Sequence, residues 1–199
     1  MEKKNTRNDF IMAFWKLYKV KRIEKISIRE LCEAAGYNRT TFYAHFHDIY
    51  DLLDESITKL VSPIKDDIDF INNLLDLSDP NSVEKIFLKF FSKNNKYIQL
   101  LLNNNHHSVL EDKVKDILVP QLKERLGDTY NSSIYVDYII EYQISAALGV
   151  LRYWFKDKSM KVSKEDLAHI LLEISTQGVF PTLNKNLTQP IPKDYNFIK

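Results

Sequence analysis

The chain has 199 residues, a hydrophobic content of 44% and a formal net charge of +1. This length allows a sizeable core, and we favour a small domain joined to a larger one over a single large domain. The single Cys32 excludes an intrachain disulfide, and no run of about 18 apolar residues exists to form a membrane span. Because the residues before Arg7 are polar, we also expect no secretory signal and a cytoplasmic location without membrane contact.

Composition predicts an all-α fold. The chain contains only 4 Gly and 6 Pro, and its apolar residues recur at spacings of three and four with little strand-like alternation. No strand is predicted. Cys32 falls on an apolar helical face, so we interpret it as a buried thiol rather than a nucleophile.

The first two helices have readable starts. One begins at Thr6, with Asp9 three residues later, and carries a broad apolar face. The next begins at Ser27, because Ser27 and Glu30 have the spacing of a capping box. Gly36 ends this second helix, since glycine readily takes the left-handed backbone conformation.

A third helix restarts at Asn38, a typical N-cap residue. Phe42 and Phe46 lie four residues apart and should face inward. The opposite face is polar and short-chained, which lets a helix approach base edges, and Arg39 can present its guanidinium to guanine or phosphate. Short helical hairpins also occur in proteins that bind no DNA, so this geometry alone leaves both readings open.

The stretch GYNRTTFYAHFHDIYDLL, residues 36–53, resembles the signature of TetR-family transcriptional regulators. The resemblance implies a three-helix helix-turn-helix domain at residues 1–50 and a helical effector-binding and dimerisation domain at 51–181. Residues 182–199 are rich in Asn, Lys and Pro and are predicted to form a tail without its own core. The family usually carries a phosphate-binding Lys where this chain has Ile49. The run GVLRYWFKDKSMKVSKEDLAHIL resembles, more weakly, the C-terminal body of one TetR subgroup.

Charge is distributed unevenly along the chain. Residues 1–50 contain ten Lys and Arg against six Asp and Glu, whereas the remainder contains 18 against 21. The basic share thus coincides with the helical hairpin, which would orient the protein on a polyanion. The family resemblance places Arg29 at a DNA-contacting position, and Lys21 and Arg22 are candidates for contact with the DNA backbone. The predicted DNA-binding residues are Lys21, Arg22, Ser27, Arg29, Asn38, Arg39, Thr40, Thr41, Tyr43, His45 and His47.

Further helices follow. Asp48 caps a helix from Ile49 to about Val61, and Pro63 breaks or restarts it. Segments at 63–77, 79–92, 95–104 and 109–126 come next, then a long helix at 132–155. The spacing of Ser163 and Asp166 predicts a capping box for the last helix, which ends at Gly178.

The last two helices are predicted to form a homodimer. One short recognition helix reads few base pairs, so specific binding pairs two of them about 34 Å apart on a palindromic operator. A small-residue patch permits close helix approach, although both apolar faces could instead serve the subunit's own core. The candidate interface residues are Ala146, Gly149, Tyr153, Ile170 and Ile174.

The larger domain should hold the site for a small-molecule effector if the chain is a ligand-gated repressor. Aromatic residues are abundant there, though at helical spacing they more often form plain core. The candidate pocket residues are Phe87, Phe91, Tyr97, Tyr138 and Tyr142.

Competing functions fit less well. His45 and His47 would point about 160° apart on a helix, and the neighbours His106 and His107 about 100° apart, so neither pair suits a metal. No nucleophile elbow or phosphate loop indicates an enzyme, and we predict neither metal nor cofactor. The chain is therefore expected to be a sequence-specific, DNA-binding regulator, most simply a repressor relieved by an effector. The alternative is a helical adaptor that does not bind DNA.

Overall fold

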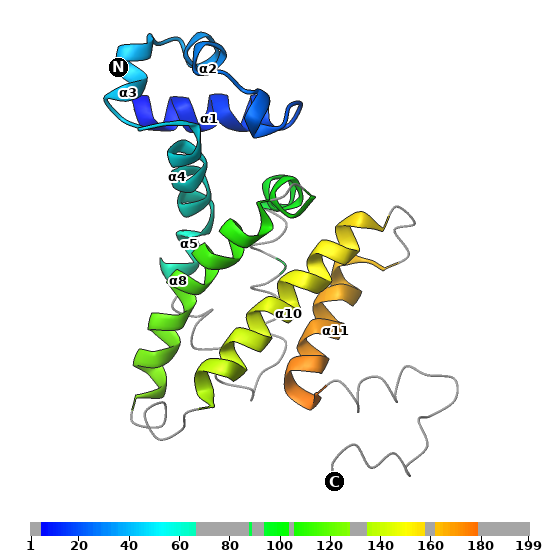
Figure 1. Ribbon diagram of the computed structural model, residues 1–199. Coiled ribbons are helices and arrows are strands. Elements are labelled where there is room, and N and C mark those ends of the chain that lie inside the picture. Colours follow the sequence, from blue (N-terminus) through cyan, green and yellow to red (C-terminus); the bar gives the residue numbers. More distant parts are fainter. Residues whose placement is uncertain are drawn as a thin grey trace.

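The computed structural model describes residues 5–66, 88, 94–103, 106–127, 135–157 and 162–178. All regular structure within these ranges is helical, which confirms the predicted all-α class. Figure 1 shows a head formed by α1, α2 and α3, with α4 leading from it into a body of longer helices. The predicted tail and most of the predicted segments at 63–77 and 79–92 lie outside the described residues.

The head contains α1 (Thr6–Tyr18), the 3-10 helix η1 (Ile23–Lys25), α2 (Ile28–Ala35) and α3 (Arg39–Tyr43). Local capping sets these bounds. The Asn5 side chain accepts a hydrogen bond from the Asn8 amide and caps α1, so the cap lies one residue before the predicted Thr6. The capping box of Ser27 and Glu30 is present at α2, and Gly36 ends that helix at a φ of 75°. The sequence pattern did not predict η1.

The body contains α4 (Ile49–Val61), α5 (Pro63–Asp66), α8 (His107–Leu126), α10 (Val136–Lys156) and α11 (Lys164–Gln177). Asp48 caps α4, and the predicted capping box of Ser163 and Asp166 begins α11. Pro120 lies inside α8, where it removes one backbone donor without ending the helix. No helix of the described part is long and apolar enough to cross a membrane.

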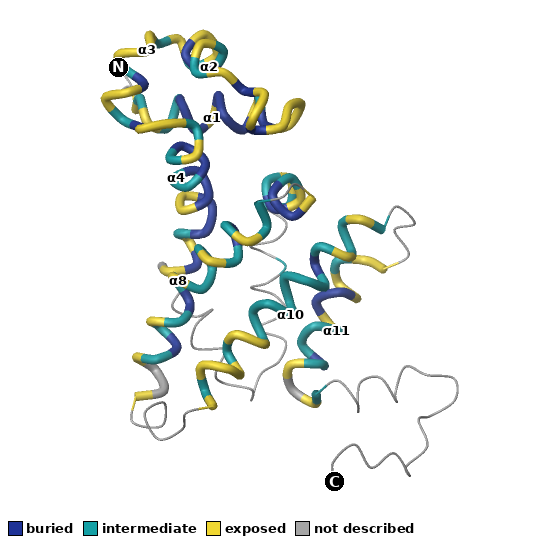
Figure 2. Tube along the Cα trace, viewed as in Figure 1, coloured by how far each residue is buried: buried dark blue, intermediate teal, exposed yellow. Residues whose placement is uncertain are grey.

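One continuous core runs through head and body (Figure 2). Its head portion is aromatic, because Phe10, Phe14 and Tyr18 follow one face of α1 and are almost fully buried. Besides its contacts with α4, α1 reaches the body through the rings of Trp15 and Tyr97, whose centroids lie 4.7 Å apart, and through the Tyr18 hydroxyl, which lies 3.0 Å from Nδ1 of His106. The head is therefore packed against the body rather than tethered to it.

Polar contacts connect the body helices. Lys115 on α8 pairs with Glu111 at 2.7 Å in its own helix and with Glu141 on α10 at 2.6 Å. Gln143 on α10 donates to Ser175 on α11, and the two helices run side by side (Figure 1). Among the described body helices, α10 therefore lies between α8 and α11.

Candidate nucleic-acid interface

The N-cap at Asn38 and the packing of Phe42 against other aromatic side chains fix the orientation of α3. The helix has only 5 residues, too few to be stable alone. The Asn38 side chain accepts from the Thr41 amide at 2.8 Å and the Thr41 hydroxyl at 3.0 Å. Phe42 is fully buried, and its ring meets Phe10 edge-on at 5.4 Å. This packing turns the opposite side of α3 outward.

The outward side of α3 carries the predicted reading residues. Arg39, Thr40 and Tyr43 are all exposed, and Tyr43 retains 58% of its accessible surface. No acidic side chain of the described residues pairs with Arg39. A short helix with an uncommitted guanidinium, a hydroxyl and an aromatic side chain can enter the major groove and contact base edges or phosphates.

The predicted residues around α2 are already engaged within the protein. The Ser27 hydroxyl belongs to the capping box, and Lys21 forms an ion pair with Glu30. The Lys21 contact and the bonds from Ser27 lower the pKa of Glu30 to about 2. Arg29 pairs with Glu33 at 2.8 Å, which raises the Arg29 pKa. DNA would have to compete with these glutamates for both cations.

The start of α4 differs from the phosphate-binding arrangement that the family resemblance implies. Ile49 is half-buried against the core and offers no charge. The Asp48 carboxylate accepts from the amides of Tyr50 and Asp51, and the Asp51 carboxylate accepts from the His47 amide at 2.8 Å. Two carboxylates thus occupy the helix start. The exposed His47 imidazole remains there as a candidate for phosphate contact.

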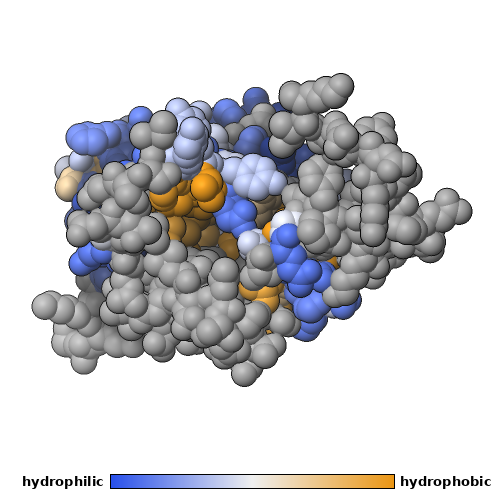
Figure 3. Space-filling model, turned by 90° about the horizontal axis from the view of Figure 1, so that it is seen from below, coloured by the Kyte–Doolittle hydropathy of each residue, from blue (hydrophilic) through white to orange (hydrophobic). Residues whose placement is uncertain are grey.

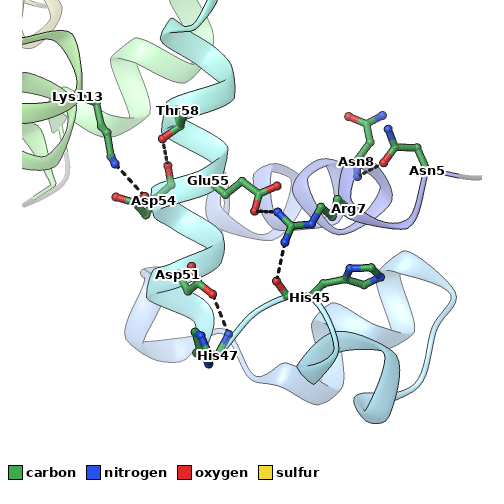
Figure 4. Close-up of polar contacts among 10 residues, drawn as sticks. All are labelled: Asn5, Arg7, Asn8, His45, His47, Asp51, Asp54, Glu55, Thr58 and Lys113. Atoms are coloured by element: carbon green, nitrogen blue, oxygen red, sulfur yellow. Dashed lines mark hydrogen bonds and ion pairs between the residues drawn. The ribbon is translucent and has the colours of Figure 1, made fainter. Parts of the chain in front are cut away.

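Arg7 is a head residue that the sequence pattern did not single out. Its guanidinium pairs with Glu55 on α4 and donates to the backbone oxygen of His45 at 3.3 Å (Figure 4). Thus the predicted residue His45 meets Arg7 through its backbone. The contact partners are 38 residues apart, so no helical spacing could have revealed them.

The described members of the predicted effector pocket do not come together. Tyr97 packs on Trp15 under the head, whereas Tyr138 and Tyr142 are exposed on α10. Phe87 and Phe91 lie outside the described residues. A groove of about 510 Å³ between α8 and α10 includes Tyr138, with Lys115, Val119, Pro120, Ile140 and Glu141 around it. Seen from below, hydrophobic side chains of the described residues are visible on this face of the body (Figure 3).

Tyr138 and Tyr142 instead share a face with the predicted dimer residues. At about 100° per residue, seven positions of α10 and its N-cap fall within one narrow sector. The larger members are well exposed, with Tyr153 at 77% and Tyr138 at 75%. Ile170 and Ile174 on α11 are half-buried. We call this sector the α10 stripe; its members are Tyr135, Tyr138, Ile139, Tyr142, Ala146, Gly149 and Tyr153.

Comparison with known proteins agrees with this geometry. A TetR-type family described as a transcriptional regulator C-terminal region matches residues 81–177. A TetR-family transcriptional regulator from Streptomyces coelicolor is similar in structure, with a TM-score of 0.58 and 18% identity over 85% of this chain and 80% of that one. A TetR-family regulator from Bordetella parapertussis has a TM-score of 0.51 and 13% identity over 90% of this chain and 98% of that one. No curated protein sequence matches the chain.

The fold and the outward face of α3 define an all-helical protein with a helix-turn-helix head of the kind that binds DNA. Residues 81–177 match the C-terminal region of TetR-type transcriptional regulators, and the fold of the chain is that of the TetR-family regulators compared above.

Proposed function

We propose that the chain is a homodimeric, sequence-specific DNA-binding repressor that a small-molecule effector releases from its operator. The observation that carries the DNA-reading part is the exposed face of α3, where Arg39, Thr40 and Tyr43 project from a helix fixed by Asn38 and Phe42. Arg39 is the principal candidate for a base contact, because no acidic side chain in the described part of the chain pairs with its guanidinium and its fork matches guanine.

The α10 stripe supports the homodimer. It runs the length of a 21-residue helix, and its aromatic and aliphatic members are exposed in the single chain. Ala146 and Gly149 lie at its centre, where small side chains let two helices approach closely, and space around the Gly149 Cα is open. Two copies packed along this stripe would bury its apolar surface and place two heads on a palindromic site.

The groove between α8 and α10 supports a small-molecule effector. Its volume of about 510 Å³ lies within the range of ligand sites, which is roughly 300 to 1,000 Å³. It is bounded by α10, the helix that carries the stripe. An effector that bound one spacing of the two heads better than another would shift the dimer away from its operator-binding geometry.

Selection from a random-sequence pool of DNA duplexes, followed by binding measurements over a salt series, tests the proposal. We expect the chain to enrich a palindromic sequence and the logarithm of its affinity to fall linearly with the logarithm of salt concentration, because phosphate contacts release counterions. A helical adaptor would enrich no sequence and would retain no duplex at low salt.

A further inference from the structure

We propose that Arg7 is a positioning residue for DNA recognition: it fixes the recognition helix α3 against α1 and α4 without itself contacting DNA. This inference rests on the proposed reading of DNA by α3. It concerns a residue outside the predicted DNA-binding set, and it assigns to that residue control over sequence preference.

The first support is the number of elements that the Arg7 guanidinium joins. From the first turn of α1, Nη1 pairs with the Glu55 carboxylate in the middle of α4, and Nη2 donates to the His45 backbone oxygen at 3.3 Å. The guanidinium carbon lies 5.6 Å from the centre of the Phe46 ring. One planar group thereby meets α4 and the segment that leaves α3 (Figure 4).

The second support is the chemistry of the chain after α3. Helix ends leave backbone carbonyls without intrahelical partners. At the end of α3, the amides of His45 and Phe46 both donate back to the Phe42 carbonyl, at 2.9 Å each. The His45 carbonyl points away from that turn and receives Nη2 of Arg7. A charged donor is a stronger partner there than a neutral one.

The third support is where the described restraints on α3 act. Its 5 residues bury one large side chain, Phe42, and its cap at Asn38 acts within the helix itself. The link to α4 is held at its far end, where the His47 amide donates to Asp51. Phe46 anchors the middle of the same link in the core, and Arg7 holds its near end at the His45 carbonyl. Loss of Arg7 should therefore change how α3 is presented while leaving Asn38 and Phe42 in place.

Arg7 also has a route to the body of the protein. Next to Glu55 on α4, the Asp54 carboxylate pairs with Lys113 of α8 at 2.9 Å. A displacement of α4 against α8 would move Glu55 and, through Arg7, the end of α3. We call the contacts of Arg7 with Glu55 and His45 the Arg7 clamp. Through this clamp, the orientation of α3 depends on the position of α4.

The experiment compares Arg7→Met, Arg7→Lys, Glu55→Gln and the double variant Arg7→Met/Glu55→Gln. Each protein is first shown to be folded by its circular dichroism melt. Affinities are then measured for the duplex that the wild-type chain selects from a random pool and for a scrambled duplex of equal length, over a salt series.

Arg7→Met is expected to lower the ratio of selected to scrambled affinity about tenfold, with an unchanged salt slope, because the contacts to base edges are misaligned. Glu55→Gln should lower the same ratio, and the double variant should lose little more than Arg7→Met alone, because both changes break one clamp. Arg7→Lys should recover thermal stability but not the ratio, since an ammonium on a flexible stem is a poor substitute for the planar fork.

Two outcomes would overturn the inference. If Arg7→Met weakens both duplexes equally and reduces the salt slope by about one, while Glu55→Gln has no such effect, Arg7 is a phosphate contact. If none of the variants changes the ratio, Arg7 has no part in recognition. If the wild-type chain enriches no sequence at all, the proposed function fails before Arg7 is tested, so the two failures remain distinct.

Discussion

The Tyr18 hydroxyl and Nδ1 of His106 lie 3.0 Å apart and share a hydrogen bond between residues 88 positions apart in the chain. Tyr18 ends α1, and His106 immediately precedes α8, so this bond joins the head to the body. Tyr18 is 2% exposed, which shields the bond from water. The docking of the head therefore includes a polar contact as well as the apolar contact of Trp15 with Tyr97.

Removal of the Tyr18 hydroxyl should weaken this docking. We expect Tyr18→Phe to lower the free energy of unfolding by about 1 kcal/mol, because it leaves the His106 nitrogen without its tyrosine partner. That corresponds to about 2 to 4 °C in melting temperature for a chain of this size. Tyr50→Phe is the control, since Tyr50 is 50% exposed and its change should have almost no effect on the melt. Equal melts for the two variants would contradict the prediction.

Arg39 should govern sequence preference. Arg39→Ala is expected to weaken binding to the selected duplex by about 1–3 kcal/mol and to relax the preference at one base position, because a guanidinium fork to guanine is lost. Tyr43→Ala should also weaken this complex. Arg22→Ala is the comparison: as a backbone candidate, it should weaken selected and scrambled duplexes alike. Unchanged affinity and preference in both α3 variants would show that α3 does not read DNA.

The capping box of α2 should make stability depend on acidity. The pKa of Glu30 is lowered to about 2, chiefly by Lys21 and then by Ser27, so its contribution is present above the unfolded-state pKa near 4.5. That contribution is lost as the pH falls toward about 2. Glu30→Gln should therefore melt below the wild type at pH 7, and the difference should close between about pH 4.5 and 2. A difference that stays constant across this range would contradict the assignment.

The buried hydroxyl of Ser56 should lower the free energy of unfolding relative to an alanine at the same position. Its side chain is 1% exposed on α4, and its hydroxyl has no hydrogen-bond partner among the residues that the structure describes. Ser56→Ala should raise the free energy of unfolding by about 1 kcal/mol, because a buried unpaired hydroxyl is removed. The same change at Ser163, which caps α11, should lower it by about 1 kcal/mol. Urea unfolding at one protein concentration measures both, and equal signs would contradict the prediction.

The α10 stripe should set the oligomeric state. Ala146→Glu places a charge at its centre, where a second copy would bury it without a partner, so we expect a monomer at micromolar concentration. Ser108→Glu adds the same charge at an exposed position of α8 and should leave the dimer intact. Analytical ultracentrifugation distinguishes these states. A wild-type monomer at that concentration would contradict the two-half-site interpretation.

The sequence by itself determined the helical class and most helix starts. Each N-cap side chain accepts a hydrogen bond from a backbone amide two or three residues ahead, so these caps could be predicted locally. The capping residues are Ser27, Asn38, Asp48 and Ser163. Helical spacing also placed Phe42 and Phe46 inward. Arg29 and Glu33 stand at the spacing of a helical ion pair, a signal that could have warned of their contact.

Only the tertiary structure decided which face meets which partner. Periodicity indicates that Tyr97 lies on an apolar face, but not that this face meets Trp15 of the head rather than Tyr138. It likewise cannot show that Lys21 reaches Glu30 or that Arg7 reaches His45. These contacts depend on how separate helices pack, which no local spacing encodes. The outward face of α3 could therefore be predicted from the sequence, whereas the side chains that hold α3 in place required the fold.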